Sequence, residues 1–302
     1  MDMKRKFNLL FVIALMLCVV GCQTRNGDLG DGMRNFVDDY GDSVMVPAHP
    51  QRIVSVSPAI TEILFALGAN ERMVGRTDFC LYPEAASAIE SIGGISNLNI
   101  EKILSLHPDL VISGSMVPEK TVQHLLSLGV PVACVIEKSR FDDLYQNILN
   151  VGKLVGMTDK AEQLNAGLQQ RLTSVLDSLG VSHLADDQRP SVYYVVGYGK
   201  EGNYTAGGNT FINDIIKMAG GSNVAEGITG WNFSLEALMV ADPDYIMIRK
   251  EDASAFCSMP PYNGLRAVRE GKVIAIESGL VDLQVPRNID GIIFIAKALH
   301  DK

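Results

Sequence analysis

Short apolar runs alternate with helical segments of about ten residues along most of this chain, and this alternation limits the fold more than any other feature. The run 52–56 reads as a buried strand, and Ser57-Pro58 is placed as the N-cap and first residue of a helix that ends at Gly68. Further strands are predicted at 73–75, 108–112, 130–136 and 192–196. Because such alternation builds βαβ units, the sequence predicts an α/β fold with mainly parallel sheets.

One long helical segment interrupts this alternation. Its apolar residues recur every three or four positions, at Ala161, Leu164, Leu168, Leu172, Val175 and Leu179. A helix over 159–179 would be roughly 30 Å long. We therefore predict two lobes, each with a central, mainly parallel sheet flanked by helices, over 50–157 and 183–302. One backbone helix within 158–182 joins them.

The chain also repeats a local pattern, each residue lying 135 positions from its counterpart. Glu101 begins a helical stretch that leads to Pro108-Asp109 and a strand, and Glu236 begins one that leads to Pro243-Asp244. A Pro-Asp pair is a common way to end a helix and enter a strand, but it does not explain the matched glutamates. Each lobe is thus predicted to present one glutamate at a helix start, where the helix dipole also favours a carboxylate.

The N-terminus carries a targeting signal. Basic residues at 4–6 precede an apolar run at 9–20, which is too short to span a membrane, and small residues then lead to Cys22. This order resembles the lipobox of bacterial lipoproteins, so 1–22 is predicted to be a signal peptide and Cys22 to be lipidated. An ordinary signal peptide or a short buried helix is the alternative. Residues 23–49 are predicted to form a tether and a hairpin.

Composition excludes several classes of partner. The net charge of −9 disfavours nucleic acid and anionic lipid as partners. With 47% hydrophobic and 20% charged residues the chain reads as globular. The lipid anchor is the predicted link to a membrane. Cys80, Cys134 and Cys257 allow either one disulfide with a free thiol or three free thiols.

Catalytic motifs are missing from the sequence. It contains no GxSxG, HExxH, CxxC or P-loop, and its five histidines are scattered. We therefore predict no enzymatic activity, no cofactor and no protein-bound metal. Aromatic residues instead lie in predicted loops at one end of the two sheets, where ligands bind in open α/β sheets. They are Phe79, Tyr82, Tyr198, Tyr204 and Trp231, and together they suggest an aromatic-lined cleft.

Several segments in this order resemble the solute-binding proteins of ABC transporters, in the group that carries cobalamin, ferric siderophores or haem. They are PQRIVSVSPAITEILFALGANERMVGRTDFCLYPE, NIEKILSLHPDLVIS, TAGGNTFINDIIKMAGGSNVAEG, WNFSLEALMVADPDYIMI, GKVIAIESGL and VPRNIDGI. The resemblance covers about residues 50–299. It implies two lobes with the ligand between them. It also implies a monomer that delivers this ligand to a permease dimer with its ATPase, with Glu101 and Glu236 docking onto the permease. The protein would act outside the inner membrane, on the periplasmic or cell-surface side.

The segment around Phe79 and Tyr82 and the one around Trp231 most resemble the cobalamin receptors. Corrinoids have flat apolar faces and an amide rim, which stacking aromatics suit. The predicted ligand-binding residues are the five aromatics and Arg287. A ferric siderophore would need cationic side chains, for which Arg76, Arg249 and Arg287 are the candidates. Haem would need an axial ligand, and Tyr82 could serve.

Overall fold

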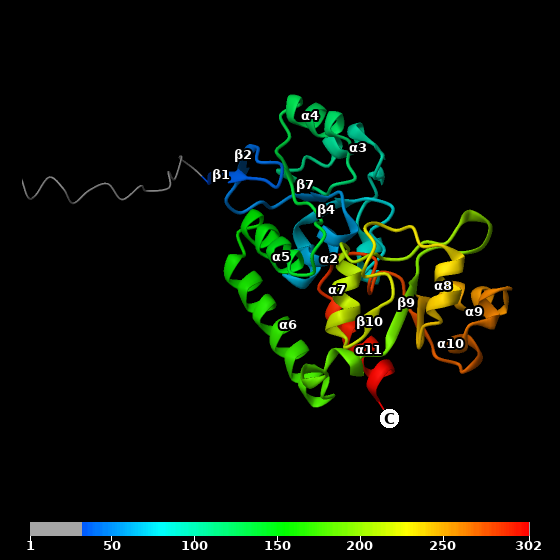
Figure 1. Ribbon diagram of the computed structural model, residues 1–302. Helices are drawn as coiled ribbons and strands as arrows, with labels where there is room; N and C mark the ends of the chain where they lie inside the picture. Colours follow the sequence, from blue (N-terminus) through cyan, green and yellow to red (C-terminus); the bar gives the residue numbers. More distant parts are fainter. Residues whose placement is uncertain (1–31, 302) are drawn as a thin grey trace, which may run out of the picture.

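The structure is a computed structural model that describes residues 32–301. The predicted signal peptide, Cys22 and the first part of the tether lie outside the described residues. The chain then forms an antiparallel hairpin of β1 (Met33–Val37) and β2 (Ser43–Pro47). Phe36, Val44 and Val46 turn into the core, so alternate residues of the hairpin anchor it to the first lobe (Figure 1).

The first lobe is built on a parallel sheet with the strand order β4-β3-β7-β8. These strands are β3 (Ile53–Ser55), β4 (Met73–Arg76), β7 (Leu110–Ser113) and β8 (Val132–Cys134). The helices of this lobe are α2 (Pro58–Ala66), α3 (Ile100–Ser105), α4 (Glu119–Ser127) and α5 (Asp143–Leu154). A small hairpin of β5 (Gly93–Gly94) and β6 (Asn97–Leu98) follows β4.

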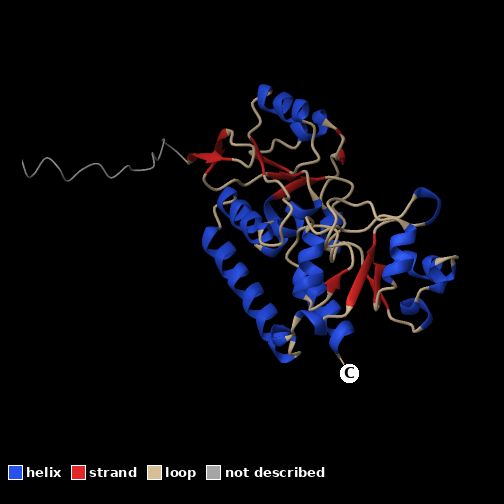
Figure 2. Ribbon diagram, viewed as in Figure 1, coloured by secondary structure: helices blue, strands red, loops and turns tan. Residues whose placement is uncertain are grey.

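The second lobe repeats this plan, with the parallel order β10-β9-β11-β12. Its strands are β9 (Ser191–Val195), β10 (Ser222–Asn223), β11 (Tyr245–Arg249) and β12 (Val273–Ile276). Its helices are α7 (Phe211–Met218), α8 (Leu235–Ala241), α9 (Lys250–Ser258), α10 (Arg266–Arg269) and α11 (Asn288–His300). In both sheets the first strand of the lobe lies between the second and the third. The predicted α/β class with two parallel sheets is confirmed (Figure 2).

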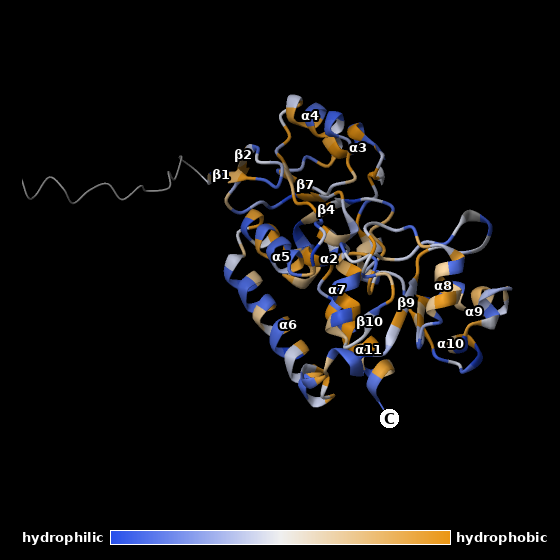
Figure 3. Ribbon diagram, viewed as in Figure 1, coloured by the Kyte–Doolittle hydropathy of each residue, from blue (hydrophilic) through white to orange (hydrophobic). Residues whose placement is uncertain are grey.

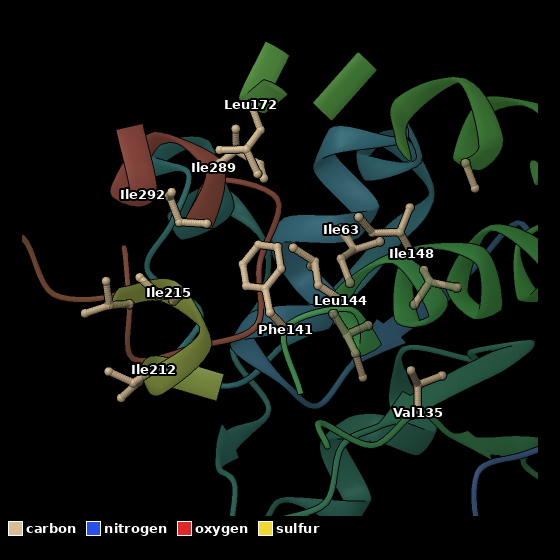
Figure 4. Close-up of a cluster of buried hydrophobic side chains, with 14 of the residues drawn as sticks. Ile63, Val135, Phe141, Leu144, Ile148, Leu172, Ile212, Ile215, Ile289 and Ile292 are labelled. Carbon is tan, nitrogen blue, oxygen red and sulfur yellow. The ribbon is translucent and has the colours of Figure 1, made fainter. Parts of the chain in front are cut away.

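The long helix α6 (Thr158–Ser178) runs along both lobes and packs against α5 and α11 (Figure 1). It buries only Ala161, Asn165 and Leu172, and Figure 3 shows it mostly hydrophilic along its length. One continuous apolar cluster lies between α6 and the two sheets, and it includes Ala161 and Leu172 of α6. Figure 4 shows Phe141 in this cluster with Ile63 of the first lobe and Ile289 of the second. The lobes therefore share a core on the α6 side, and each has a separate outer cluster on its far side.

The repeat predicted from the sequence extends to the backbone. Among the described non-glycine residues only His107 and Asp242 have a positive φ, 47° and 34°. Each stands directly before the proline of its Pro-Asp pair, where proline disfavours the right-handed helical region. Both helices of the repeat thus lead into a residue with positive φ at the equivalent position of the repeat.

The helix starts differ in whether a side chain caps them. Thr210 caps α7 by accepting a hydrogen bond from the Asn213 amide. Ser57 occupies the predicted N-cap position of α2, but its side chain makes no cap hydrogen bond. Its hydroxyl donates to the Glu137 carboxylate at 3.0 Å, which is a charge-assisted hydrogen bond.

Candidate functional site

The predicted ligand-binding residues lie in loops that follow the carboxyl ends of the strands. In the first lobe, residues 77–83 follow β4 and residues 135–142 follow β8. In the second lobe, residues 196–204 follow β9, residues 224–234 follow β10, and residues 277–287 connect β12 to α11. In open α/β sheets this edge is where ligands bind. We call these loops the binding edge.

Arg287 joins the two lobes at this edge. Its guanidinium donates from Nε and Nη2 to the two carboxylate oxygens of Glu62, at 2.7 and 2.9 Å. The ring of Tyr82 stacks on the same guanidinium, 4.1 Å from centroid to Cζ. Glu62 comes from α2 and Tyr82 from the loop after β4, so one C-terminal side chain contacts two elements of the first lobe.

The Glu62–Arg287 pair is buried, with side chains 5% and 16% exposed. Burial raises the pKa of the Glu62 carboxyl above its ordinary value, and the Arg287 guanidinium opposes that rise. Gly279 has a positive φ, and a Cβ there would collide with the Arg287 guanidinium. The backbone at 279 therefore leaves just enough room for the arginine.

The rest of the 77–83 loop presents apolar side chains to solvent. Phe79, Leu81 and Tyr82 are 60%, 70% and 50% exposed. Arg76 holds this segment from behind by donating to the carbonyl oxygens of Thr77, Ala86 and Ser87. The guanidinium of Arg76 is thus engaged by backbone carbonyls of its own segment, while the side chains of Phe79, Leu81 and Tyr82 are exposed to solvent.

The second lobe presents Tyr204 and Trp231, which are 37% and 44% exposed. Their backbone segments are joined, because Thr205 donates its amide to the Trp231 carbonyl at 2.8 Å and Tyr204 forms an isolated antiparallel bridge with Asn232. Gly197 has no room for a side chain beside the Tyr204 ring. These two predicted aromatics are therefore neighbours.

Tyr198 is more firmly packed than the other predicted aromatics. Its ring meets Phe256 and Tyr262 edge-on, with centroids 5.3 and 6.0 Å apart. Burial raises the pKa of Tyr198, with a smaller contribution from the Asp252 carboxylate. Tyr198 thus belongs as much to the outer core of the second lobe as to its edge.

A second arginine, Arg249 at the end of β11, is also paired. Its Nε donates to Asp282 at 3.0 Å, and the same carboxylate accepts the Tyr194 hydroxyl. Burial would lower the pKa of Arg249, but the Asp282 carboxylate leaves it above its ordinary value. All three arginines that the sequence singled out are engaged with protein groups.

Carboxylates also occur at this edge. Glu137, in the loop after β8, accepts the hydroxyls of Ser57 and Ser115, each at 3.0 Å. These hydroxyls are neutral, so they orient the carboxylate without cancelling its charge. The first lobe therefore contributes a negative group to the binding edge.

Glu101 and Glu236 are both exposed, at the second position of α3 and of α8. Asn99 and Ser234 cap these helices through side-chain oxygens. A helix that leads into a parallel strand starts on the side where the preceding strand ends. The two glutamates thus lie at helix starts on the binding-edge side of their lobes.

Cys80, Cys134 and Cys257 are free thiols. Within 32–301 no group of three or more His, Cys, Asp or Glu side chains could hold a metal ion, and none of the helices found there is long and apolar enough to cross a membrane. A hollow of about 310 Å³ lies between the hairpin and α4, and the predicted site residues do not line it.

Glu62 is the site residue that the sequence analysis missed. It is the only charged residue in the helix PAITEILFA, and a buried carboxylate almost always has a partner. That signal marks the residue as unusual. It does not identify Arg287, which lies 225 positions away.

Two similar lobes, a backbone helix and exposed aromatics at the facing edges define a bilobed ligand-binding protein. The model of the periplasmic binding protein family matches residues 53–280. The chain belongs to this family and is the substrate-binding component of an ABC importer. As such it has a permease partner and a small-molecule ligand, it is not an enzyme, and it works outside the cytoplasm.

The relatives differ in what their names say they bind. The ABC transporter substrate-binding lipoprotein YvrC of Bacillus subtilis is 29% identical over 87% of this chain and 85% of its own length. A cobalamin-binding protein of Halobacterium salinarum is 28% identical over 87% of this chain and 73% of its own. The haem-binding protein RhuT of Roseiflexus has a similar solved structure, with a TM-score of 0.71 and 28% identity, covering 83% of this chain and 98% of that one.

Proposed function

We propose that this protein captures cobalamin or a related corrinoid between its lobes and delivers it to the permease. The observation that carries the proposal is the set of exposed apolar side chains at the binding edge, from Phe79 and Tyr82 on one lobe to Tyr204 and Trp231 on the other. A corrinoid offers a flat apolar face to such side chains and amides to polar ones. The halobacterial relative supports this ligand.

The test is calorimetric titration of the purified protein with cyanocobalamin. We expect one-to-one binding below about 1 µM, or about −8 kcal/mol, with quenching of Trp231, the only tryptophan. Tyr82→Ala and Trp231→Ala should each weaken binding at least about tenfold. The matched control is Tyr40→Ala, which removes a similarly exposed tyrosine from the hairpin. The absence of both heat and quenching would reject the corrinoid.

Haem is the second candidate, because the exposed Tyr82 beside Arg287 could supply an axial phenolate. RhuT supports this alternative. A haemin titration followed by the Soret band separates the two ligands. Haem binding predicts a shifted band that Tyr82→Phe abolishes, whereas corrinoid stacking tolerates Tyr82→Phe.

We also propose that Glu101 and Glu236 dock onto the two permease subunits, because matched carboxylates on two similar lobes suit a two-fold partner. The double variant Glu101→Ala/Glu236→Ala should retain cargo affinity and lose uptake in cells. Glu119→Ala, at the start of α4, is the control. Uptake at the wild-type rate by the double variant would reject this role.

Anchoring through Cys22 is proposed on the lipobox-like sequence and on the lipoprotein relative YvrC. Metabolic labelling with a radioactive fatty acid should mark the wild type and not Cys22→Ser. Labelling of the variant would reject the anchor. We further propose that the protein acts as a monomer, which light scattering of the purified protein tests directly.

A further inference from the structure

The Glu62–Arg287 pair lies at the edge where we propose that cargo binds. Arg287 is the cation in contact with a predicted ligand-binding aromatic, since Tyr82 stacks on its guanidinium. Two of its nitrogens already face the two oxygens of Glu62. A free arginine at this place would attract carboxylates of a ligand. Glu62 takes two of its five N–H donors and compensates its charge, and Nη1 faces the Ser278 carbonyl at 3.5 Å.

The other charged groups of the binding edge point the same way. Arg249 is paired with Asp282, and Arg76 donates to three carbonyl oxygens of its own loop. Glu137 accepts hydrogen bonds from two neutral hydroxyls, so these partners supply no positive charge to it. These arginines thus offer an anionic ligand little compensation for losing its water, and the exposed Lys200 is the lysine in the loop after β9.

Packing holds this arrangement in place. The backbone at Gly279 encloses the guanidinium on one side and the Tyr82 ring covers it on another. Glu62 is itself 5% exposed and held within α2. Ligand binding cannot release Arg287 without leaving Glu62 as a buried unpaired charge, which is strongly unfavourable.

We propose that Glu62 is a specificity-determining residue: by neutralising Arg287 it makes the binding edge favour uncharged chelates and reject anionic ones. The proposal rests on the proposed function, because it names the charge class of the same cargo. It applies to the residue on α2 and not to the aromatics, which bind flat apolar faces of either charge class. Cobalamin is an uncharged chelate, whereas haem carries two carboxylates.

The experiment compares two dissociation constants, for haemin and for cyanocobalamin, with protein purified after export of the full-length chain. Glu62→Gln leaves Arg287 charged and unpaired. It should lower the haemin constant about tenfold relative to that of cyanocobalamin, the size expected for one charge pair near 10 Å at an effective dielectric of about 20. The cyanocobalamin constant should change by less than about twofold.

Asp186→Asn is the matched control. Asp186 lies before β9, at the end of the sheet opposite the binding edge, where it is fully exposed and pairs with Arg189. This variant also leaves an arginine without its carboxylate, but away from the binding edge, so it should change the ratio of the two constants by less than about twofold. An equal shift in Asp186→Asn and Glu62→Gln would overturn the proposal, as would no shift in Glu62→Gln or no detectable haemin binding by it.

Two further variants decide the matter if Glu62→Gln does not fold. Arg287→Gln leaves the carboxylate alone and should shift the ratio in the opposite direction, against haemin. Glu62→Gln/Arg287→Gln carries no charge at either position and should restore the wild-type ratio. The proposal is overturned if Arg287→Gln does not shift the ratio against haemin, or if the double variant differs from the wild type in this ratio. Failure of the wild type to bind cyanocobalamin would reject the corrinoid but not this inference, which is then judged on haemin against ferrichrome, an uncharged chelate.

Discussion

The two lobes share a plan at the amino ends of their strands and differ at the carboxyl ends. At the amino ends, Asp109 and Asp244 of the two Pro-Asp pairs both reach back to the start of the first strand of their sheet. At the carboxyl ends, the first lobe presents a loop held from behind by Arg76. The second presents Tyr204 and Trp231 on joined extended segments. The repeat thus persists where it sets the sheet, and it ends where the cargo is proposed to bind.

Because the two lobes share one core, we expect them to unfold together. Phe141→Ala should cost about 3–5 kcal/mol, because Phe141 is 2% exposed within the cluster that both lobes share. Trp231 lies in the second lobe, so its fluorescence in a urea titration should report the full loss. Phe141→Leu, the smaller change, should cost less. A midpoint unchanged at Trp231 would show that the lobes unfold separately.

Asp109 and Asp244 should contribute unequally to stability, because their hydrogen-bond partners differ. Asp109 accepts the backbone amides of Gln51 and Arg52, whereas Asp244 accepts the amide and hydroxyl of Ser191 and the guanidinium of Arg266. Asp244→Asn should therefore cost about 2 kcal/mol and Asp109→Asn about 1 kcal/mol. Equal costs in urea unfolding would contradict this asymmetry.

The pH dependence of Asp244 provides a second measurement. Burial would raise the pKa of Asp244, but the hydrogen bonds from Ser191 and the guanidinium of Arg266 bring it below its ordinary value. A lowered native pKa gives stability that is present above the unfolded pKa of about 4 and is lost as pH falls through the native pKa. The difference between wild type and Asp244→Asn should shrink below about pH 4, and a constant difference would contradict the assignment.

Two glycines separate backbone strain from the binding edge. Gly279 and Gly271 both have positive φ, but a Cβ meets Arg287 at position 279 and open space at 271. Each alanine variant should cost about 1–2 kcal/mol of stability. Only Gly279→Ala should also lower the affinity for cargo, by about threefold to fivefold, since it displaces Arg287 from Tyr82. Equal cargo affinity in the two variants would show that Arg287 does not support the binding edge.

The smallest expected effect concerns Glu62. Because burial raises its native pKa, its titration adds stability that is fully present below the unfolded pKa of about 4 and is lost as pH rises through the native pKa. The stability of wild type relative to Glu62→Gln should therefore fall from pH 4 towards pH 7 in urea titrations. A rise over this range would mean that Arg287 outweighs the cost of burial.

Much of the fold was predictable because its signals are local. Apolar runs of strand length, helix starts and the 3.6-residue period of α6 depend on near neighbours in the chain. The repeat around Glu101 and Glu236 was visible for the same reason. The site was only partly predictable: the exposed aromatics could be placed in loops, but the pairing of Tyr82 with Arg287 and the firm packing of Tyr198 could not.

The sequence by itself determined the α/β class, the two lobes, the long helix and the loops that carry aromatics. Tertiary structure alone decided which charges cancel. Glu62 and Arg287 are 225 positions apart and meet because α2 and the start of α11 pack in one core. Local composition shows an arginine in a loop and a glutamate in a helix. Whether the arginine is free for a ligand depends on a contact between lobes, and such contacts are set by the packing of distant segments.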